Sequence, residues 1–224
     1  MTSAPRTGKP PAGRPTLLVL AGVNGAGKSS VAGASLRSQG LDYYNPDEAT
    51  AQLRAAGIAS GEANASAWEH GRRALETAIE QRRNFAFETT LGGNTIPALV
   101  ARACTAHDVT LWFVGLDSPE RHIARVASRV AAGGHDIPAD KIRARWDGAR
   151  RNLIGLLPQL HELRVYDNSH EQPEGAAAAN PSLLLHWRAG QIVAPAMSRL
   201  RHTPEWAKPI VEAARRLAYD RHGS

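Results

Sequence analysis

Residues 22–29 restrict the fold of this chain more than any other segment. They read Gly22-Val23-Asn24-Gly25-Ala26-Gly27-Lys28-Ser29 and match the whole phosphate-binding pattern G-x-x-x-x-G-K-[ST]. Glycines let the backbone curl so that its N–H groups face a phosphate chain. The lysine places positive charge on the β- and γ-phosphates, and the serine hydroxyl is a ligand for Mg²⁺. The segment therefore predicts a site for ATP or GTP. The residues expected to bind it are Asn24, Gly25, Ala26, Gly27, Lys28, Ser29 and Ser30.

The residues on either side of this loop agree with the motif. Residues 16–21 are apolar and uncharged, which is typical of a strand buried on both faces of a parallel sheet. Residues 30–38 have a helical apolar pattern that ends before Gly40. Strand, glycine-rich loop and helix follow one another in the required order, which disfavours a chance glycine-rich turn.

Composition limits the class of protein and its partners. The 224 residues suit one α/β domain with a small appendage. The net charge is +6, and arginine outnumbers lysine. This balance favours anionic ligands such as nucleotides or phosphorylated metabolites, or else only a basic surface. No tight Lys/Arg run is present, so a nucleic-acid partner is not expected.

The sequence also predicts the compartment. Cys104 is the only cysteine, which excludes an intramolecular disulfide, and its apolar helical surroundings favour core packing over nucleophilic chemistry. No apolar stretch approaches the roughly 20 residues of a membrane span. The first 15 residues lack an apolar signal core. We expect a cytoplasmic enzyme with a flexible tail over residues 1–15.

Strands and helices alternate along the chain. Strands are predicted at residues 41–45, 84–88, 109–116, 163–168 and 183–187. Helices are predicted at residues 46–54, 63–82, 95–106, 119–132, from 139 onward, and 204–221. In the second helix, Trp68, Leu75 and Ile79 share one face. Such alternation predicts a parallel sheet with helices on both faces.

Two carboxylates follow predicted strands. Ligands of open α/β sheets bind beyond the carboxyl ends of the strands, so Asp47 is placed to take a proton from a substrate hydroxyl. Alternatively, it only complements the dipole of its helix. Glu88 ends an apolar strand, where a buried carboxylate needs a partner. That partner is a metal-bound water, a substrate hydroxyl or a structural arginine.

An arginine-rich helix pair predicts a lid. Residues 121, 125 and 129 lie four apart and share one helix face. Gly133-Gly134 then interrupts the helix, and Arg143, Arg145, Arg150 and Arg151 follow. Arginines closing on phosphates would neutralise charge during phosphoryl transfer, although most of them are expected on a solvated basic face.

Other titratable residues give weaker signals. The pair His135-Asp136 is too small for a zinc site, which needs three or four protein ligands. Asp117 follows a strand, but it precedes a proline-capped helix and is expected to be a turn residue. Asp167-Asn168-Ser169 are expected near the nucleotide base. We predict no metal other than the Mg²⁺ that the nucleotide brings.

The sequence resembles the zeta-toxin family of P-loop kinases. The similar segments cover about residues 16–169, and the Gly-Gly-His segment of the lid is the most specific of them. They read LAGVNGAGKSS from Leu20, NPD from Asn45, FETTL from Phe87, RVASRVAAGGHDIP from Arg125, IRARW from Ile142 and RNL from Arg151.

The resemblance implies a doubly wound P-loop kinase that phosphorylates a UDP-activated amino sugar, such as UDP-N-acetylglucosamine, on a sugar hydroxyl. Lys28 and Ser29 would bind ATP and Mg²⁺, and Asp47 would be the general base. Glu88 and Thr90 would line the metal or acceptor pocket. Arg129 and Arg145 would be the lid arginines on the triphosphate. An antitoxin protein is the partner that the resemblance adds.

We expect three regions along the chain. Residues 1–15 form the tail, residues 16–180 the P-loop kinase domain with its lid around 121–150, and residues 181–224 an appendage packed on the same domain. Gly92-Gly93 stand where better-known toxins tend to carry an arginine, so the acceptor stays open between a UDP-sugar and another metabolite or antibiotic. A simple ATPase and a nucleotide-gated binding module are the alternative functions.

Overall fold

The computed structural model describes residues 13–28, 43–134, 136–170 and 181–222. Its sheet contains β1 (Thr16–Ala21), β2 (Tyr43–Tyr44), β3 (Phe85–Thr89), β4 (Asp108–Gly115), β5 (Glu162–Asp167), β6 (Ser182–Arg188) and β7 (Gln191–Ala194). Its α-helices are α2 (Pro46–Ala55), α3 (Ser60–Glu80), α4 (Thr95–Ala103), α5 (Pro119–Ala131), α6 (Ala139–Leu156) and α7 (Lys208–His222). Ser29, Ser30, His135 and the helix predicted at residues 30–38 lie outside the described residues.

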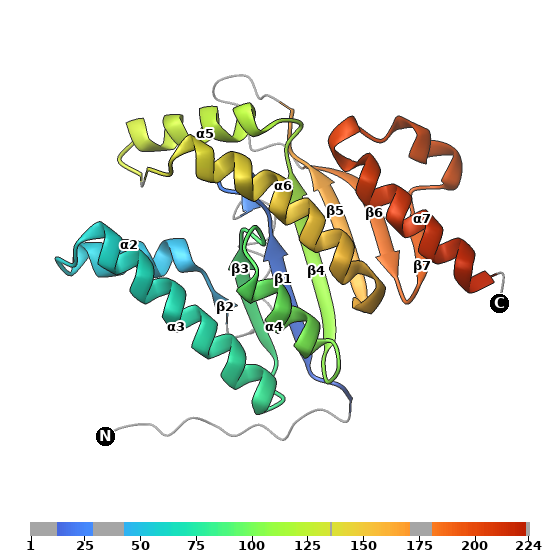
Figure 1. Cartoon of the computed structure of the whole chain (residues 1–224), viewed down its shortest axis with the longest axis horizontal. Coiled ribbons are helices and arrows are strands. Elements are labelled where there is room, and N and C mark those ends of the chain that lie inside the picture. Colours follow the sequence, from blue (N-terminus) through green and yellow to red (C-terminus); the bar gives the residue numbers. More distant parts are fainter. Residues whose placement is uncertain (1–12, 29–42, 135, 171–180, 223–224) are drawn as a thin grey trace.

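The seven strands form one sheet in the order β2-β3-β1-β4-β5-β6-β7 (Figure 1). The first five strands run parallel, whereas β6 and β7 are antiparallel to their neighbours. The prediction of a parallel sheet is therefore corrected to a mixed, mostly parallel one. Strand β7 was not predicted, because the turn before it contains Ala189 at φ 49° beside Gly190 at φ 88°. Alanine is not among the residues that signal such hairpin turns.

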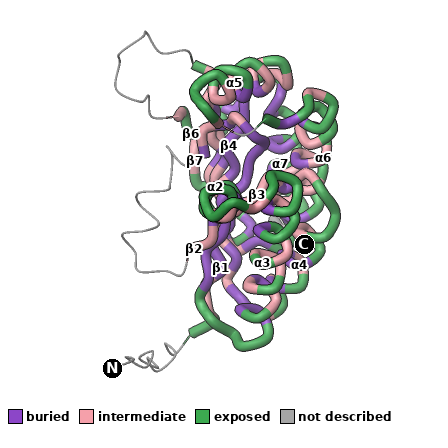
Figure 2. Tube along the Cα trace, turned by 90° about the vertical axis from the view of Figure 1, so that its left-hand side faces the viewer, coloured by how far each residue is buried: buried purple, intermediate pink, exposed green. Residues whose placement is uncertain are grey.

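The main hydrophobic core lies between one face of the sheet and the helices that pack against this face. Side chains from one face of the strands, including Leu17, Val19 and Phe113, pack with buried residues of α3, α4, α6 and α7. Figure 2 shows these four helices on the same side of the sheet. Leu18 and Leu20 point to the opposite face and form a smaller cluster. Helices α3, α4, α6 and α7 thus cover one face, whereas the helix predicted at residues 30–38 lies outside the described residues.

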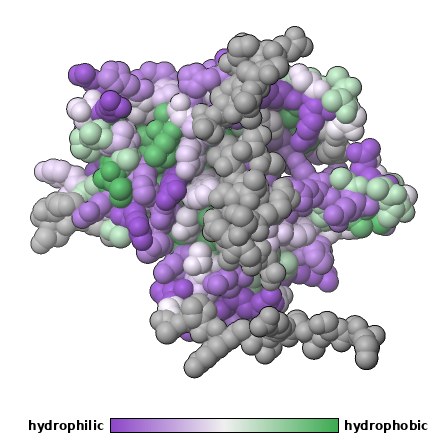
Figure 3. Space-filling model, turned by 180° about the vertical axis from the view of Figure 1, so that it is seen from behind, coloured by the Kyte–Doolittle hydropathy of each residue, from purple (hydrophilic) through white to green (hydrophobic). Residues whose placement is uncertain are grey.

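The rear view mixes hydrophilic with hydrophobic residues over the visible surface (Figure 3). Among the described residues, no helix is long and apolar enough to cross a bilayer.

Local signals explain where two helices begin. Asn45 caps α2, because its side-chain oxygen accepts hydrogen bonds from the backbone N–H groups of Asp47 and Glu48. Ser118 caps α5 in the same way, and Pro119 occupies the first turn. Both starts agree with the predictions. The last helix begins at Lys208 instead of residue 204, because a 3₁₀ turn at Glu205–Ala207 precedes it.

The three residues predicted to share one face of α3 are covered to different extents. Leu75 and Ile79 are buried as expected, but 46% of Trp68 is exposed. The helical period identifies a common face, yet it does not say how far along the helix that face stays covered.

The segment after β6 packs against the P-loop strands. Trp206 belongs to the main core together with Ile210 and Val211 of α7. Its indole ring lies against Gly115 at the end of β4 and 6.3 Å from the ring of Phe113. A side chain at position 115 would collide with this indole. Strand β4 and the C-terminal segment therefore share one packed interior.

This packing predicts that Trp206→Ala lowers the free energy of unfolding by about 3–5 kcal/mol, since it leaves a large cavity. The matched control is Tyr219→Ala on α7, where 80% of the side chain is exposed, and it should change stability by less than about 0.5 kcal/mol. Urea denaturation of both variants measures the difference. Equal stability of Trp206→Ala and wild type would contradict this packing.

Candidate active site

The glycine-rich loop leaves β1 at the carboxyl end of the sheet. Gly25 and Gly27 have φ angles of 81° and 83°, which other residues rarely adopt. A Cβ atom at position 25 would lie 2.8 Å from the carbonyl oxygen of His122. At position 27 it would collide with the side chain of Asn168. Both the backbone conformation and the close neighbours therefore require glycine here.

Lys28 forms a buried ion pair at the end of this loop. Its Nζ atom lies 3.4 Å from Oε1 of Glu88, and both side chains are almost completely buried. Glu88 also accepts hydrogen bonds on Oε2 from the Tyr43 hydroxyl at 3.0 Å and from Nδ2 of Asn45 at 3.4 Å. These donors compensate for the burial of the carboxylate. Its structural partner is thus Lys28, not the arginine that was one sequence alternative.

Asp47 lies in the first turn of α2, with its side chain 55% exposed. Its Oδ2 atom is 3.4 Å from Nη1 of Arg129, near the end of α5. The structure therefore brings together an acid and a lid arginine that the sequence singled out separately. The ion pair is compatible with either interpretation of Asp47, as a base or as a helix-start acid.

Asn24 connects the phosphate-binding loop to both helices of the predicted lid. Nη1 of Arg145, on α6, donates to Oδ1 of Asn24 at 2.7 Å. Nδ1 of His122, on α5, donates to the Asn24 carbonyl oxygen at 2.9 Å. Burial lowers the pKa of the Arg145 guanidinium, with a smaller opposing effect from Asp47. Both contacts fix the loop relative to the helices.

A cleft of about 560 Å³ opens beside the loop. Its walls come from α2, α3, the β3–α4 loop and the segment that leads into α6. The predicted site residues among its lining are Asn24, Asp47, Glu88, Thr90 and Arg145. The cleft therefore adjoins the phosphate-binding loop and brings together five of the residues that the sequence singled out.

Sequence reasoning missed His122, whose only signal is its place one turn into α5. Burial lowers its pKa to about 4, so the imidazole is neutral near pH 7. Nε2 of this ring is buried and has no hydrogen-bond partner among the described residues.

Asn168 was expected near the nucleotide base, but it contacts the phosphate-binding loop. Its Nδ2 atom donates to the carbonyl oxygen of Ala26 at 2.9 Å. Nη2 of Arg125 donates to its carbonyl oxygen at 2.8 Å. Asn168 therefore links Arg125 to the phosphate-binding loop.

Most other lid arginines point elsewhere, as expected. Arg121 pairs with the turn residue Asp117 at 2.8 Å, and Arg143 pairs with Glu120 at 3.3 Å. The guanidinium of Arg150 stacks 3.4 Å from the ring centroid of Trp146. No cluster of three or more metal-ligating side chains occurs in the described ranges.

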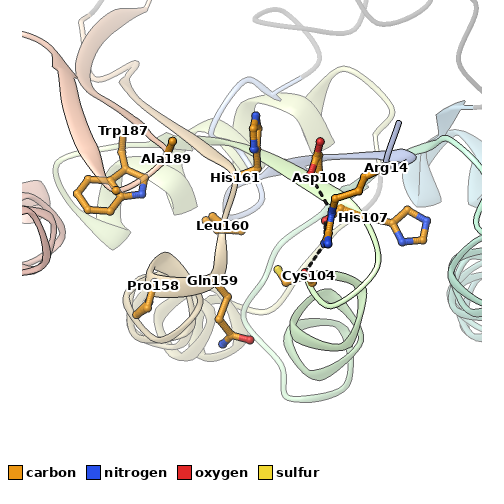
Figure 4. A pocket seen from close by; sticks show the side chains of 11 residues that line it. Arg14, Cys104, His107, Asp108, Pro158, Gln159, Leu160, His161, Trp187 and Ala189 are labelled. Atoms are coloured by element: carbon orange, nitrogen blue, oxygen red, sulfur yellow. Dashed lines mark hydrogen bonds and ion pairs between the residues drawn. The ribbon is translucent and has the colours of Figure 1, made fainter. Parts of the chain in front are cut away.

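A second, smaller pocket lies at the amino ends of the parallel strands (Figure 4). Arg14 crosses it, pairing with Asp108 at 3.0 Å and donating to the carbonyl oxygens of Cys104 and His107. Burial raises the pKa of the Cys104 thiol to about 11, so this thiol is unreactive. Since ligands of such sheets bind at the opposite strand ends, this pocket is structural.

The fold defines the class of this protein: a mostly parallel, kinase-like P-loop sheet whose first strand runs into the phosphate-binding loop. A profile of the zeta toxin family matches residues 3–172, well over half of the chain. The chain therefore belongs to the zeta toxin family, which confirms the resemblance.

One protein sequence and two solved structures are similar to this chain, and the two structures share its fold. An uncharacterized protein of Haemophilus influenzae (strain ATCC 51907 / DSM 11121 / KW20 / Rd) is 32% identical over 136 residues, which cover 56% of this chain and 88% of the relative. The structure of the PezAT chromosomal toxin-antitoxin system of Streptococcus pneumoniae has a TM-score of 0.56 at 14% identity, covering 96% of this chain and 90% of that one. The AvrRxo1-ORF1:-ORF2 complex with ATP has a TM-score of 0.59 at 17% identity, covering 91% and 64%.

The buried imidazole predicts a pH dependence of stability. In the unfolded chain His122 takes up a proton near pH 6.5, whereas in the folded chain it does so only near pH 4. Stability is therefore complete above pH 6.5 and falls as the pH drops toward 4, by about 3 kcal/mol for this group. His122→Gln, which keeps an N–H donor for Asn24, should lack this part of the loss in urea denaturation at several pH values. Parallel curves for variant and wild type would contradict the assignment.

Proposed function

We propose that this protein is an ATP-dependent phosphotransferase that moves the γ-phosphoryl group of ATP to a hydroxyl of a small molecule. The observation that carries the proposal is the cleft beside the phosphate-binding loop, because it contains the carboxylate of Asp47 at the end where the nucleotide phosphates would lie. A binding module that only senses nucleotide has no need for an acceptor cleft of this size.

The residues present fit ATP and Mg²⁺. Gly25 and Gly27 have left-handed φ angles of 81° and 83°, the backbone conformation with which such loops turn N–H groups toward phosphate oxygens. Lys28 is already held at this place by Glu88. The Ser29 hydroxyl and the Glu88 carboxylate would hold Mg²⁺, directly or through water. Bound ATP supplies the phosphoryl group that is transferred.

Residues of the chain would accept the proton of the acceptor hydroxyl and supply positive charge to the phosphoryl group. Asp47 would accept the proton of the acceptor hydroxyl while the hydroxyl oxygen forms a bond to the γ-phosphorus of ATP. The bond from this phosphorus to the oxygen that bridges the β- and γ-phosphates breaks, and ADP leaves. The nearby Arg129 would orient this carboxylate through their ion pair. Arg145 and Lys28 would stabilise negative charge on the phosphoryl oxygens. A simple ATPase would use the same carboxylate to orient water and is the main alternative.

No comparison supports a UDP-sugar as the acceptor. An antitoxin protein is proposed because the similar PezAT structure is a toxin-antitoxin system. Coexpression with the product of the adjacent reading frame, followed by size-exclusion chromatography, tests it: a stable complex supports an antitoxin, and separate elution counts against one.

Asp47→Asn should lower kcat for phosphoryl transfer by about 10²–10⁴-fold, because the proton acceptor is lost, and should leave the Kd for ATP unchanged. Glu48→Gln is the matched control, since Glu48 is also an acid in the first turn of α2. If Asp47 acted only on the helix dipole, both variants would behave alike. Transfer of labelled γ-phosphate measures kcat, and calorimetry measures Kd.

The role of Lys28 needs a test that separates binding from folding, because removing it alone leaves the Glu88 carboxylate buried and unpaired. The double variant Lys28→Met, Glu88→Gln removes both charges, and Glu88→Gln alone is its control. We expect the double variant to bind ATP about 10–100-fold more weakly than the control, since a charge-assisted contact to phosphate is lost. Equal affinities in calorimetry would argue against Lys28 as a phosphate ligand.

A further inference from the structure

Two side chains from outside the phosphate-binding loop hold carbonyl oxygens of that loop. Nδ1 of His122 lies 2.9 Å from the carbonyl oxygen of Asn24, and Nδ2 of Asn168 lies 2.9 Å from that of Ala26. These pairs are 98 and 142 positions apart in the sequence. Because a carbonyl oxygen only accepts hydrogen bonds, both side chains donate here, which places the proton of the neutral imidazole on Nδ1.

Each of these carbonyl groups shares a peptide unit with the N–H group of a glycine. The glycine is Gly25 after Asn24, and Gly27 after Ala26. Both peptide bonds are trans, since Ala194-Pro195 holds the only cis bond among the described residues. In a planar trans peptide the C=O and N–H bonds point in opposite directions. Both glycine N–H groups are therefore turned away from the side chains that hold the carbonyl oxygens.

These two N–H groups are available to a ligand. In the part of the chain that the structure describes, neither Gly25 nor Gly27 donates to a protein acceptor, whereas the N–H of Ala26 donates to the carbonyl oxygen of Val23 at 3.0 Å. Backbone donors of a loop of this kind cradle a phosphate chain. The orientation of the two glycine N–H groups thus decides how many donors the loop offers to a nucleotide.

Glycine makes the orientation of these peptides depend on their anchors. Gly25 and Gly27 have positive φ angles, but glycine adopts negative values about as readily. A peptide unit that precedes glycine can therefore rotate at low cost. Rotation would turn the carbonyl oxygen of Asn24 or Ala26 toward the phosphates, where its partial negative charge would repel them. Hydrogen bonds to these carbonyl oxygens oppose the rotation.

The anchor on α5 is itself rigid. His122 is only 1% exposed, so its ring has no room to turn. Its carbonyl oxygen and the side chain of Val126, one turn further along α5, both lie beside Gly25. Burial lowers the pKa of the imidazole to about 4, so near pH 7 the ring donates through Nδ1 without adding a charge to the loop.

The anchor after β5 is held through its backbone. The N–H of Asn168 donates to the carbonyl oxygen of Gly115 at 3.0 Å, and its carbonyl oxygen accepts from Nη2 of Arg125 at 2.8 Å. These bonds fix Asn168 between the end of β4 and helix α5. Its side-chain amide lies directly against the loop, because a Cβ atom at position 27 would collide with Nδ2.

We propose that His122 and Asn168 are positioning residues of the nucleotide site. By holding two carbonyl oxygens of the loop outward, they turn the N–H groups of Gly25 and Gly27 toward the phosphates of ATP. This inference rests on the ATP binding of the proposed function and adds two residues that lie outside the phosphate-binding motif. Each residue acts through one peptide unit of the loop and needs no contact with the nucleotide.

The first experiment observes the N–H of Gly25 by NMR. Asn24-Gly25 is the only Asn-Gly pair in the chain, so full-length protein labelled with ¹³C at asparagine carbonyls and ¹⁵N in glycine gives one carbonyl-selected amide signal. ATP with Mg²⁺ should shift this proton downfield in the wild type, because it forms a hydrogen bond to phosphate. The shift should be lost in His122→Leu and retained in His122→Asn, whose Nδ2 replaces the imidazole Nδ1. No shift in the wild type, or equal shifts in wild type and His122→Leu, would overturn the role of His122.

The second experiment measures the Kd for ATP by calorimetry. His122→Leu and Asn168→Leu should each raise this Kd about tenfold, because one charge-assisted contact to phosphate is lost. His122→Asn should restore the Kd to within about threefold of the wild type, since it keeps the donor. An unchanged Kd in both leucine variants would contradict the positioning role.

Two control variants separate this role from general packing. Val126→Ala removes an apolar contact beside Gly25 but no hydrogen bond to the loop. Asn152→Leu removes hydrogen bonds from an asparagine to the carbonyl oxygens of Leu91 and Gly93, in the β3–α4 loop. Both controls should keep the wild-type Kd for ATP. If they weaken ATP binding as much as the leucine variants of the two anchors, loosened packing explains the effect and the inference is wrong.

Failure of the proposed function would look different. A wild-type protein that binds ATP but phosphorylates no acceptor would contradict the phosphotransferase, whereas the Gly25 signal and the Kd values would still decide the role of His122 and Asn168. A wild-type protein that does not bind ATP would overturn both.

Discussion

The ion pair between Lys28 and Glu88 is the interaction on which the arrangement of the site depends. Leu20 and Glu88 are register partners on the neighbouring strands β1 and β3, so the pair joins the loop that follows β1 to the end of β3. Both charges are buried, and neither would be stable there alone. Tyr43 and Asn45, at the end of β2, complete the group. Polar side chains from the carboxyl ends of β1, β2 and β3 are thereby held together in one site.

Much of the fold could be predicted because its signals are local. The loop of residues 22–29, the caps Asn45 and Ser118, and the apolar strands each carry their meaning within a few residues. The antiparallel edge of the sheet could not be predicted, because the sequence of β6 does not indicate whether the strand runs parallel or antiparallel to β5. The turn before β7 was missed because it contains Ala189, a residue that is not typical of such turns. Trp68 shows the same limit: it shares a helical face with Leu75, but coverage of that face depends on distant elements.

The site is less predictable than the fold, because its contacts join residues far apart in sequence. Asp47 and Arg129 are 82 positions apart, and Asn24 and Arg145 are 121 apart. Periodicity placed the lid arginines on helix faces, but only the packing of α5 and α6 decides which of them face the loop. The resemblance to a family selected Arg129 and Arg145. His122 has no comparable signal in the sequence, since a lone histidine in a helix has no distinctive pattern.

The glycine contact between the β3–α4 loop and α6 has a mechanical consequence. Gly92 and Gly148 touch through backbone atoms, and Asn152 bonds the loop to the same helix at two carbonyl oxygens. Sliding α6 along the sheet would break these bonds and expose Ile142 and Leu153, which are fully buried. Helix α6, Arg145 and this wall of the cleft are therefore held together as one rigid unit.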